Sequence, residues 1–434
     1  MSKQFKQRTM RIFSLGALVV LYLTALPVLG QDREYCERII EKLSAPQMQG
    51  RGYVKHGVEK AAKFLEKEMA EIGLKTSSDY AQHFKLDVNT YPGAMKVKVN
   101  GKELRPMDDY AVYPWSKGIK GDFKVYTPDL DNWDIEKIMS DIKSLDTTNL
   151  FVAYPRGFVK AFREDLLKIR KLGVPGFIEL MPREKMHWFV VYSERVRPKT
   201  TLMMANDMLK PGSVVDISLN IKNKFIKDYE TQNVVGYIPG KVQPDSMIVI
   251  GAHYDHLGCM GKGNYFPGAN DNASGVAMVL DLARHFMKKE NQPDCTIWFV
   301  LFGAEEKGLL GAEHFNENLP VPKSQVKYVI NFDMIHTFSD HLNVFNGNNE
   351  KELFQKLKNV YDAKERPFEL LSKENSPYSD HFPFVKNDIK ALFLTTFSIG
   401  DPLKYHVMTD DNDAFSFEHW DHFFELIKGM VEAN

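Results

Sequence analysis

The sequence contains little cysteine and almost no net charge. Its three cysteines, Cys36, Cys259 and Cys295, are too few among 434 residues to form a disulfide framework. Lysine and arginine total 56 and aspartate and glutamate total 57, so the net charge is −1 and no broad basic field is expected. We therefore expect no nucleic acid among the partners of this chain. Repeats and low-complexity tracts are also missing from the sequence, which excludes a collagen-like or largely disordered chain.

The first 30 residues have the order of a secretory signal peptide. They contain four basic residues and no acidic residue, and an uncharged apolar run occupies 12–29. Val28 and Gly30 are small, so we expect cleavage after Gly30 and a periplasmic or secreted protein with no stable membrane partner. An uncleaved membrane anchor is the alternative, because about 18 uncharged residues is the lower limit for a span. In an oxidising compartment, an odd number of cysteines leaves at least one without a partner in the same chain.

The length predicts two to three domains at roughly 150 residues per domain. Apolar residues recur at spacings of three and four within 33–75, which predicts helices, and Gly50-Arg51-Gly52 interrupts them. From about 93 to 220, proline and glycine separate short strand-like runs. The sequence therefore predicts a signal peptide over 1–30, a main domain formed by 31–92 and 221–434, and an inserted smaller α/β subdomain over 93–220.

The last 200 residues alternate between apolar strands and helices. The four predicted strands are near-continuous apolar runs at 247–250, 296–302, 328–332 and 391–395. Runs of this kind are typical of strands that are covered on both faces. Helices predicted at 274–288 and 350–361 lie between them. This alternation predicts an α/β fold with a mostly parallel central sheet flanked by helices.

Polar side chains gather where these strands end. The residues concerned are His253 and Asp255 after the first run, Glu305 and Glu306 after the second, Asp333 after the third, and Asp271 in the loop that opens the first helix. Ligand sites in open α/β sheets lie beyond the carboxyl ends of the strands. Carboxylates that converge without a cation would repel one another, whereas imidazole and carboxylate together suit zinc or a similar divalent ion. The residues themselves therefore predict a metal site, with zinc, cobalt and manganese all open as its metal.

Five segments together resemble the co-catalytic di-zinc aminopeptidases of peptidase family M28. They are Gly-Ala-His253-Tyr-Asp255, Pro-Gly-Ala-Asn-Asp271-Asn-Ala-Ser-Gly, Phe-Gly-Ala-Glu305-Glu306-Lys-Gly-Leu-Leu-Gly, Asn-Phe-Asp333-Met and Tyr405-His406. Each segment alone is a weak signal, but their order and their positions after strands are highly specific. The resemblance covers about 33–92 and 230–434, and implies a zinc aminopeptidase-like fold for this metallopeptidase domain.

The resemblance also implies two Zn²⁺ ions per chain. His253 and Asp333 would bind one ion, Glu306 and His406 would bind the other, and Asp271 would bridge the two. The peptide bond between Asp271 and Asn272 is expected to be cis, as it is in structures of this family.

Three further residues receive roles from the resemblance. Asp255 would orient His253, and Glu305 would be the general base that takes a proton from a metal-activated water. Tyr378, just before Ser379-Asp380-His381, lies where some relatives carry a tyrosine that stabilises the oxyanion. His256 and His381 lie close to the motif residues and are candidates for a place beside the ligands, and Asp410 is expected to belong to a turn and helix cap after His406.

The implied activity is removal of amino-terminal residues from peptides with a free amino terminus. One alternative is a glutaminyl cyclase with a single zinc, which would use the positions of Asp271, Glu306 and His406. Others are a binding protein that keeps the fold without catalysis, and a carboxypeptidase of the same family. The insertion resembles a protease-associated domain, although its aromatic cluster (Trp188, Phe189, Tyr192) could equally belong to a hydrophobic core.

Overall fold

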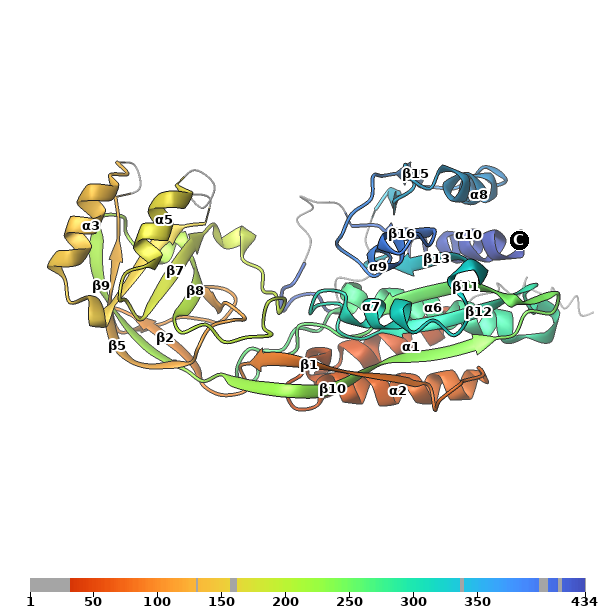
Figure 1. Cartoon of the computed structure of the whole chain (residues 1–434), viewed down its shortest axis with the longest axis horizontal. Coiled ribbons are helices and arrows are strands. Elements are labelled where there is room, and N and C mark those ends of the chain that lie inside the picture. The colour runs from red at the N-terminus through yellow and green to blue at the C-terminus, as the bar shows by residue number, and fades with distance from the viewer. Residues whose placement is uncertain are drawn as a thin grey trace, which may run out of the picture.

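The chain folds around two eight-stranded sheets in two lobes (Figure 1). A computed structural model describes residues 32–129, 132–156, 162–335, 339–397, 405–412 and 416–433. The predicted signal peptide over 1–30 lies outside the described residues. Among the helices of the described part, none combines the length and the apolar character needed to cross a membrane.

The first sheet carries the strands that the sequence predicts. In spatial order they are β1 (Ala81–Thr90), β10 (Lys224–Ile238), β12 (Cys295–Phe302), β11 (Gln243–His253), β13 (Val326–Phe332), β16 (Ala391–Thr395), β14 (His341–Phe345) and β15 (Glu369–Ser372). The central neighbours β12, β11, β13 and β16 pair in parallel. The pairs β1–β10, β10–β12 and β14–β16 are antiparallel, and β14 pairs in parallel with β15 at the edge. The fold is therefore the predicted mixed α/β architecture, with a mostly parallel centre.

Helices cover both faces of this sheet. One face packs against α1 (Arg33–Ser44), α2 (Gly57–Ile72), α6 (Gly275–Met287), α8 (Lys351–Asp362) and α10 (Trp420–Glu432), and the other against α7 (Leu310–Glu317) and α9 (Phe382–Lys386). Alternate residues of β11 enter the two cores, since Ile248 and Ile250 face α6 while Met247 and Val249 face the opposite core. Successive side chains of a strand point to opposite faces, so burial of both faces produces the near-continuous apolar runs.

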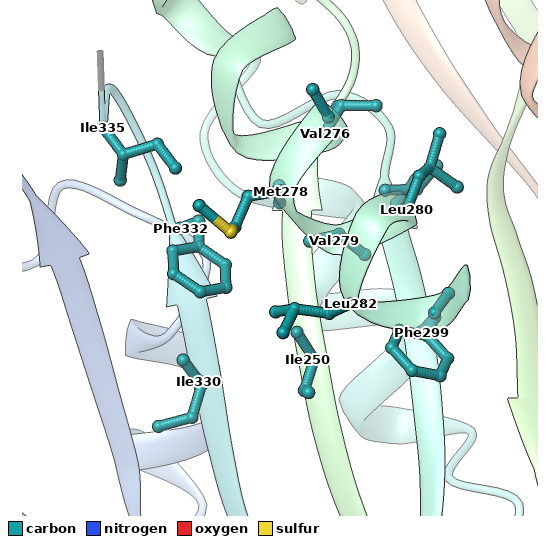
Figure 2. Close-up of a cluster of buried hydrophobic side chains, with 14 of the residues drawn as sticks. Ile250, Val276, Met278, Val279, Leu280, Leu282, Phe299, Ile330, Phe332 and Ile335 are labelled. Carbon is teal, nitrogen blue, oxygen red and sulfur yellow. The ribbon is translucent and has the colours of Figure 1, made fainter. Parts of the chain in front are cut away.

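Helix α6 lies across the centre of the sheet (Figure 2). Its side chains contact β11, β12 and β13, and Met278 lies beside Phe332. Because the start of this helix is anchored on the sheet, the loop that precedes it is held at the carboxyl ends of the same strands.

The second sheet is built from residues between Met95 and Ile221. Its spatial order is β3 (Lys102–Glu103), β2 (Met95–Val99), β9 (Ser213–Ile221), β5 (Ile119–Thr127), β6 (Leu150–Pro155), β7 (Gly176–Met181), β8 (Thr200–Ala205) and β4 (Tyr110–Val112). Helices α3 (Ile135–Ser144) and α5 (Arg163–Arg170) lie in this lobe, and the long pair β1 and β10 runs between the two lobes (Figure 1). The exact domain boundaries given above stay a prediction.

The cysteines and the amino-terminal helices agree with the predictions made from the sequence. All three cysteines are buried and free. The predicted helical segment 33–75 forms α1 and α2 on either side of Gly50-Arg51-Gly52.

Helix α6 also carries a buried carboxylate. The two carboxylate oxygens of Asp281 accept hydrogen bonds from the backbone N–H of Asp32, just before α1, at 3.1 and 3.3 Å. Burial raises the pKa of Asp281 to about 7, and the hydrogen bond from Asp32 offsets only part of this effect. The folded chain therefore binds a proton that the unfolded chain releases.

We expect Asp281→Asn to flatten the dependence of stability on pH. Between pH 3.8, the usual pKa of an aspartate, and about 7, the wild-type folded state holds the extra proton, so its free energy of unfolding falls as the pH rises. The variant should gain on the order of 1–3 kcal/mol relative to wild type across this window, measured by urea unfolding at several pH values. Asp245→Asn, at an exposed position, is the control. Parallel pH profiles for wild type and Asp281→Asn would contradict this expectation.

Candidate metal centre

The predicted ligands meet at the carboxyl edge of the first sheet. His253 is the last residue of β11, and Asp333 directly follows β13. Glu305 and Glu306 lie in the turn after β12. Since β11 pairs in parallel with both β12 and β13, these three strand ends point the same way. Asp271 lies in the loop before α6, with a cis peptide bond to the next residue as expected.

Asp271 lies between two imidazoles. Its Oδ1 is 3.4 Å from Nε2 of His253, which is also 3.4 Å from Oδ1 of Asp333. Its Oδ2 is 3.3 Å from Nε2 of His406, which is also 3.3 Å from Oε2 of Glu306. All five side chains are buried. The structure thus brings together every residue that the sequence comparison assigned as a ligand, with Asp271 in the middle.

Backbone carbonyls orient both imidazoles. Nδ1 of His253 lies 3.2 Å from the carbonyl of Asp255, and Nδ1 of His406 lies 2.7 Å from the carbonyl of Trp188 in the second lobe. A carbonyl only accepts hydrogen bonds, so each Nδ1 must be the donor. In the neutral ring, each Nε2 then presents a lone pair to carboxylate oxygens that also only accept. A cation between them would satisfy all of these acceptors at once, as in metal sites where the second ring nitrogen of a histidine donates to a carbonyl.

The donor set fits zinc. At zinc–ligand distances of about 2.0–2.1 Å, neighbouring ligand atoms of a tetrahedral ion lie about 3.3 Å apart. The separations of 3.3–3.4 Å between these nitrogens and oxygens match that spacing. They are also long for hydrogen bonds to charged groups.

His256 joins the set on the Glu306 side. It is fully buried, and its Nδ1 lies 2.8 Å from Oε1 of Glu306 and 3.8 Å from Oδ1 of Asp271. Two groups of side chains could therefore hold an ion, namely His253 with Asp271 and Asp333, and His256 with Asp271 and Glu306. Sequence reasoning placed His256 only beside the ligands. The only sequence signal for a place of His256 in the site was its position three residues after His253.

Burial and neighbouring charges shift the pKa values of the two glutamates in the site. Burial raises the pKa of Glu305 well above its usual value, and the carboxylates of Asp380 and Asp333 raise it further against the opposing effect of His253. Burial likewise raises the pKa of Glu306, and Asp271 makes the largest contribution among the carboxylates. These shifts show that the site holds more negative charge than its imidazoles balance.

Glu305 lies at the margin of the ligand set. Its side chain is 13% exposed, and its Oε2 is 4.0 Å from Nε2 of His253. A carboxylate near the ligands, still open to solvent and with a raised pKa, suits an acid and base.

The side chain of Asp255 does not make the contact with His253 that was expected of it. Its carboxylate lies 3.9 Å from Nδ1 of His253, beyond hydrogen-bonding distance. The same carboxylate instead accepts hydrogen bonds from the backbone N–H groups of Glu305 at 3.0 Å and Glu306 at 3.4 Å. Asp255 therefore holds His253 through its own carbonyl and the turn after β12 through its side chain.

Tyrosine is found beside the site, but not where it was expected. Tyr378 is 75% exposed, and within the described residues no hydrogen bond or ion pair joins it to the ligands. Tyr405 instead stacks on the ring of His406, with 3.7 Å between ring centroids. Tyr405 is itself 39% exposed. The adjacency of Tyr405 to a predicted ligand was the only sequence signal for it.

We expect Zn²⁺ to stabilise chelator-treated protein. Binding to the folded state alone stabilises it by mass action, so saturating Zn²⁺ should raise Tm by about 5 °C or more. Asp271→Asn should lose most of this rise, because Asp271 faces both imidazoles. Asp388→Asn, at an exposed position, should keep it. Differential scanning calorimetry measures the effect, and an equal rise in Asp271→Asn would contradict the proposed ligand set.

Several curated proteins are similar to part of this chain. Aminopeptidase YwaD of Bacillus subtilis is 29% identical over 226 residues, covering 49% of this chain and 46% of that protein. Leupeptin-inactivating enzyme 1 of Streptomyces exfoliatus is 33% identical over 153 residues, covering 35% and 33%. Aminopeptidase Y of Saccharomyces cerevisiae is 26% identical over 245 residues, covering 51% and 42%. The chain spans about half the length of these relatives, or less.

Solved structures match almost the whole fold. The aminopeptidase from Aneurinibacillus sp. strain AM-1 superimposes with a TM-score of 0.66 at 20% identity, covering 92% of this chain and 93% of that one. A zinc aminopeptidase from Bacillus subtilis gives 0.71 at 18% identity, covering 92% and 94%. Residues 233–431, which carry all the candidate ligands, match the model of peptidase family M28. This match covers a little under half of the chain, so it is the region with the candidate ligands that is similar to peptidase family M28.

Proposed function

We propose that this protein is a zinc-dependent aminopeptidase that removes amino-terminal residues from peptides. The observation that carries the proposal is the convergence of two imidazole nitrogens, His253 Nε2 and His406 Nε2, on three buried carboxylates. The aminopeptidases among the similar proteins support the same activity.

Each metal would be held by three protein residues. His253 and Asp333 would hold one ion, Glu306 and His406 the other, and Asp271 both. When bound, the two ions would supply the positive charge that this carboxylate-rich site lacks, and would increase the acidity of a water molecule. His256 would fix Glu306 through its Nδ1–H.

Glu305 would move the proton. Its carboxylate would accept a proton from the attacking water at an Oε atom and pass it to the amine of the leaving peptide. Asp255 fixes the backbone of Glu305, so the carboxylate is held near His253. Tyr405, which is 39% exposed and stacked on His406, would donate its phenolic proton to the developing oxyanion, whereas a similar role for Tyr378 would require its 75% exposed side chain to move.

The charge of the site favours a free amino terminus on the substrate. The α-ammonium group of a peptide would be attracted to Glu305 and the other carboxylates. A carboxyl terminus would be repelled by the same groups, which makes a carboxypeptidase the less favoured alternative. Secretion through the predicted signal peptide, and a protease-associated role for residues 93–220, complete the proposal.

We expect Glu305→Gln to lose turnover while keeping its metal. Glutamine cannot accept the proton of the attacking water, so kcat should fall about 10²- to 10⁴-fold. Hydrolysis of amino-acid p-nitroanilides measures this loss, and metal analysis of the same sample checks that zinc remains. Glu313→Gln, a partly exposed position on α7, is the control. Near-normal turnover in Glu305→Gln would remove Glu305 from this role.

Zinc content separates the proposed peptidase from a glutaminyl cyclase. We expect two zinc ions per purified chain and loss of p-nitroanilide hydrolysis when a chelator is added, with recovery on addition of Zn²⁺. A single zinc ion together with cyclisation of amino-terminal glutamine would favour the cyclase. Activity that resists the chelator would contradict metal-dependent hydrolysis altogether.

A further inference from the structure

Arg51 is fully buried beside the metal centre, and the proposed reaction does not use it. Its guanidinium has five N–H groups, and every one of them donates to a backbone carbonyl. Nη2 donates to Gly268 and Asp271 at 2.9 Å each, and Nη1 donates to Pro267 at 2.6 Å. The guanidinium therefore binds three carbonyls within the loop 267–271.

The same guanidinium joins this loop to two other segments. Nε donates to the carbonyl of Tyr254, directly after His253, at 2.8 Å, and Nη1 also donates to Leu43 near the end of α1 at 3.0 Å. Among the described residues, no ion pair is formed by Arg51. A buried charge without a directly paired carboxylate is costly, so its position demands a reason beyond packing.

Glycines on both sides of Arg51 allow its backbone to approach the loop after His253. A Cβ on Gly50 would lie 2.3 Å from the carbonyl oxygen of Gly258, and a Cβ on Gly52 would lie 2.5 Å from the Cα of Gly258. The backbone of this segment thus approaches the loop after His253 too closely for any larger residue. The tripeptide Gly50-Arg51-Gly52, which the sequence showed only as a break between helices, delivers Arg51 to the site.

Asp410 holds the same loop through the backbone N–H groups of the loop. Its Oδ1 accepts from the N–H of Asn270 at 2.9 Å, and its Oδ2 accepts from the N–H of Asp271 at 3.0 Å. Its backbone carbonyl accepts from Ala269 at 3.1 Å. Asp410 is buried and lies four residues after His406. The expected helix cap is therefore wrong, because this carboxylate caps the loop that carries Asp271.

We propose that Arg51 and Asp410 are positioning residues that hold the loop 267–271 from two sides and so fix Asp271 between the two metal-binding sets. Arg51 binds the carbonyls of the loop, and Asp410 binds its amides. Asp271 is the residue held by both, through its own C=O and its own N–H. Backbone hydrogen bonds of both kinds leave the loop little freedom to shift, and the carboxylate of Asp271 follows its backbone.

Two consequences distinguish this positioning role from a general contribution to the stability of the fold. The hydrogen-bond geometry matters as well as the charge, because a lysine offers one charged nitrogen and cannot reach five carbonyls. Arg51 and Asp410 also act on the same loop, so the effects of their substitutions on zinc affinity should be less than additive. The inference rests on the proposed zinc centre.

The test is zinc affinity, measured by competition with a chromophoric chelator on the full chain. We expect Arg51→Lys, Arg51→Met and Asp410→Asn each to weaken zinc binding by about 10- to 100-fold. The double variant Arg51→Lys/Asp410→Asn should be weakened by less than the product of the two single effects. Arg366→Met is the matched control, because Arg366 also donates to backbone carbonyls, those of His422 and Val360, which lie away from the centre. Its Tm should fall without a change in zinc affinity.

The results that would overturn the proposal can be told apart. Folded variants with wild-type zinc affinity would show that Arg51 and Asp410 only stabilise the fold. Normal affinity in Arg51→Lys with weak affinity in Arg51→Met would show that the charge, not the hydrogen bonds, is required. If the Arg51 variants do not fold, the nearly isosteric Asp410→Asn decides the matter alone. Wild-type protein that binds no zinc would contradict the proposed function itself.

Discussion

The structure depends on keeping several carboxylates and imidazoles together at one buried edge of a sheet. Asp271, Glu306 and Asp333 lie within 3.4 Å of imidazole nitrogens, and Glu305 is close by. Like charges in a buried place repel, and burial alone raises the pKa of a carboxyl group. Such a set forms only if the surrounding fold is rigid enough to hold it and if cations compensate its charge.

The first sheet provides that rigidity. Parallel pairing of β11 with β12 and β13 brings three strand ends to one edge, and α6 covers the strands behind them. The core below the site therefore fixes the positions from which His253 and Asp333 project. The loop with Asp271 leads directly into α6, which ties the carboxylate of Asp271 to the sheet.

The second lobe also takes part in the centre. The N–H of Trp188 donates to the carbonyl of His406 at 3.1 Å, while Nδ1 of His406 donates to the carbonyl of Trp188 at 2.7 Å. On the other side, Nζ of Lys307 donates to Oγ of Ser193 at 2.6 Å. The segment 188–193 is thus attached to Lys307, directly after Glu306, and to His406. Residues of the second lobe consequently set the tautomer of His406, a candidate ligand of the other lobe.

The sequence predicted those parts of the fold and site that depend on local patterns. Apolar runs predicted the central strands, and the positions of His253, Glu306 and Asp333 after them predicted a metal edge. Contacts made through the backbone left no such pattern. The carbonyl of Trp188 that orients His406 carries no side-chain signal, and Arg51 and Asp410 are recognisable only when residues more than 130 positions apart in the chain lie side by side. Asp410 was read as a helix cap because its sequence neighbours are polar, whereas its partners are the amides of Asn270 and Asp271. Sequence patterns therefore predict which side chains would bind a metal, and the fold identifies the distant groups that contact the loops carrying those side chains.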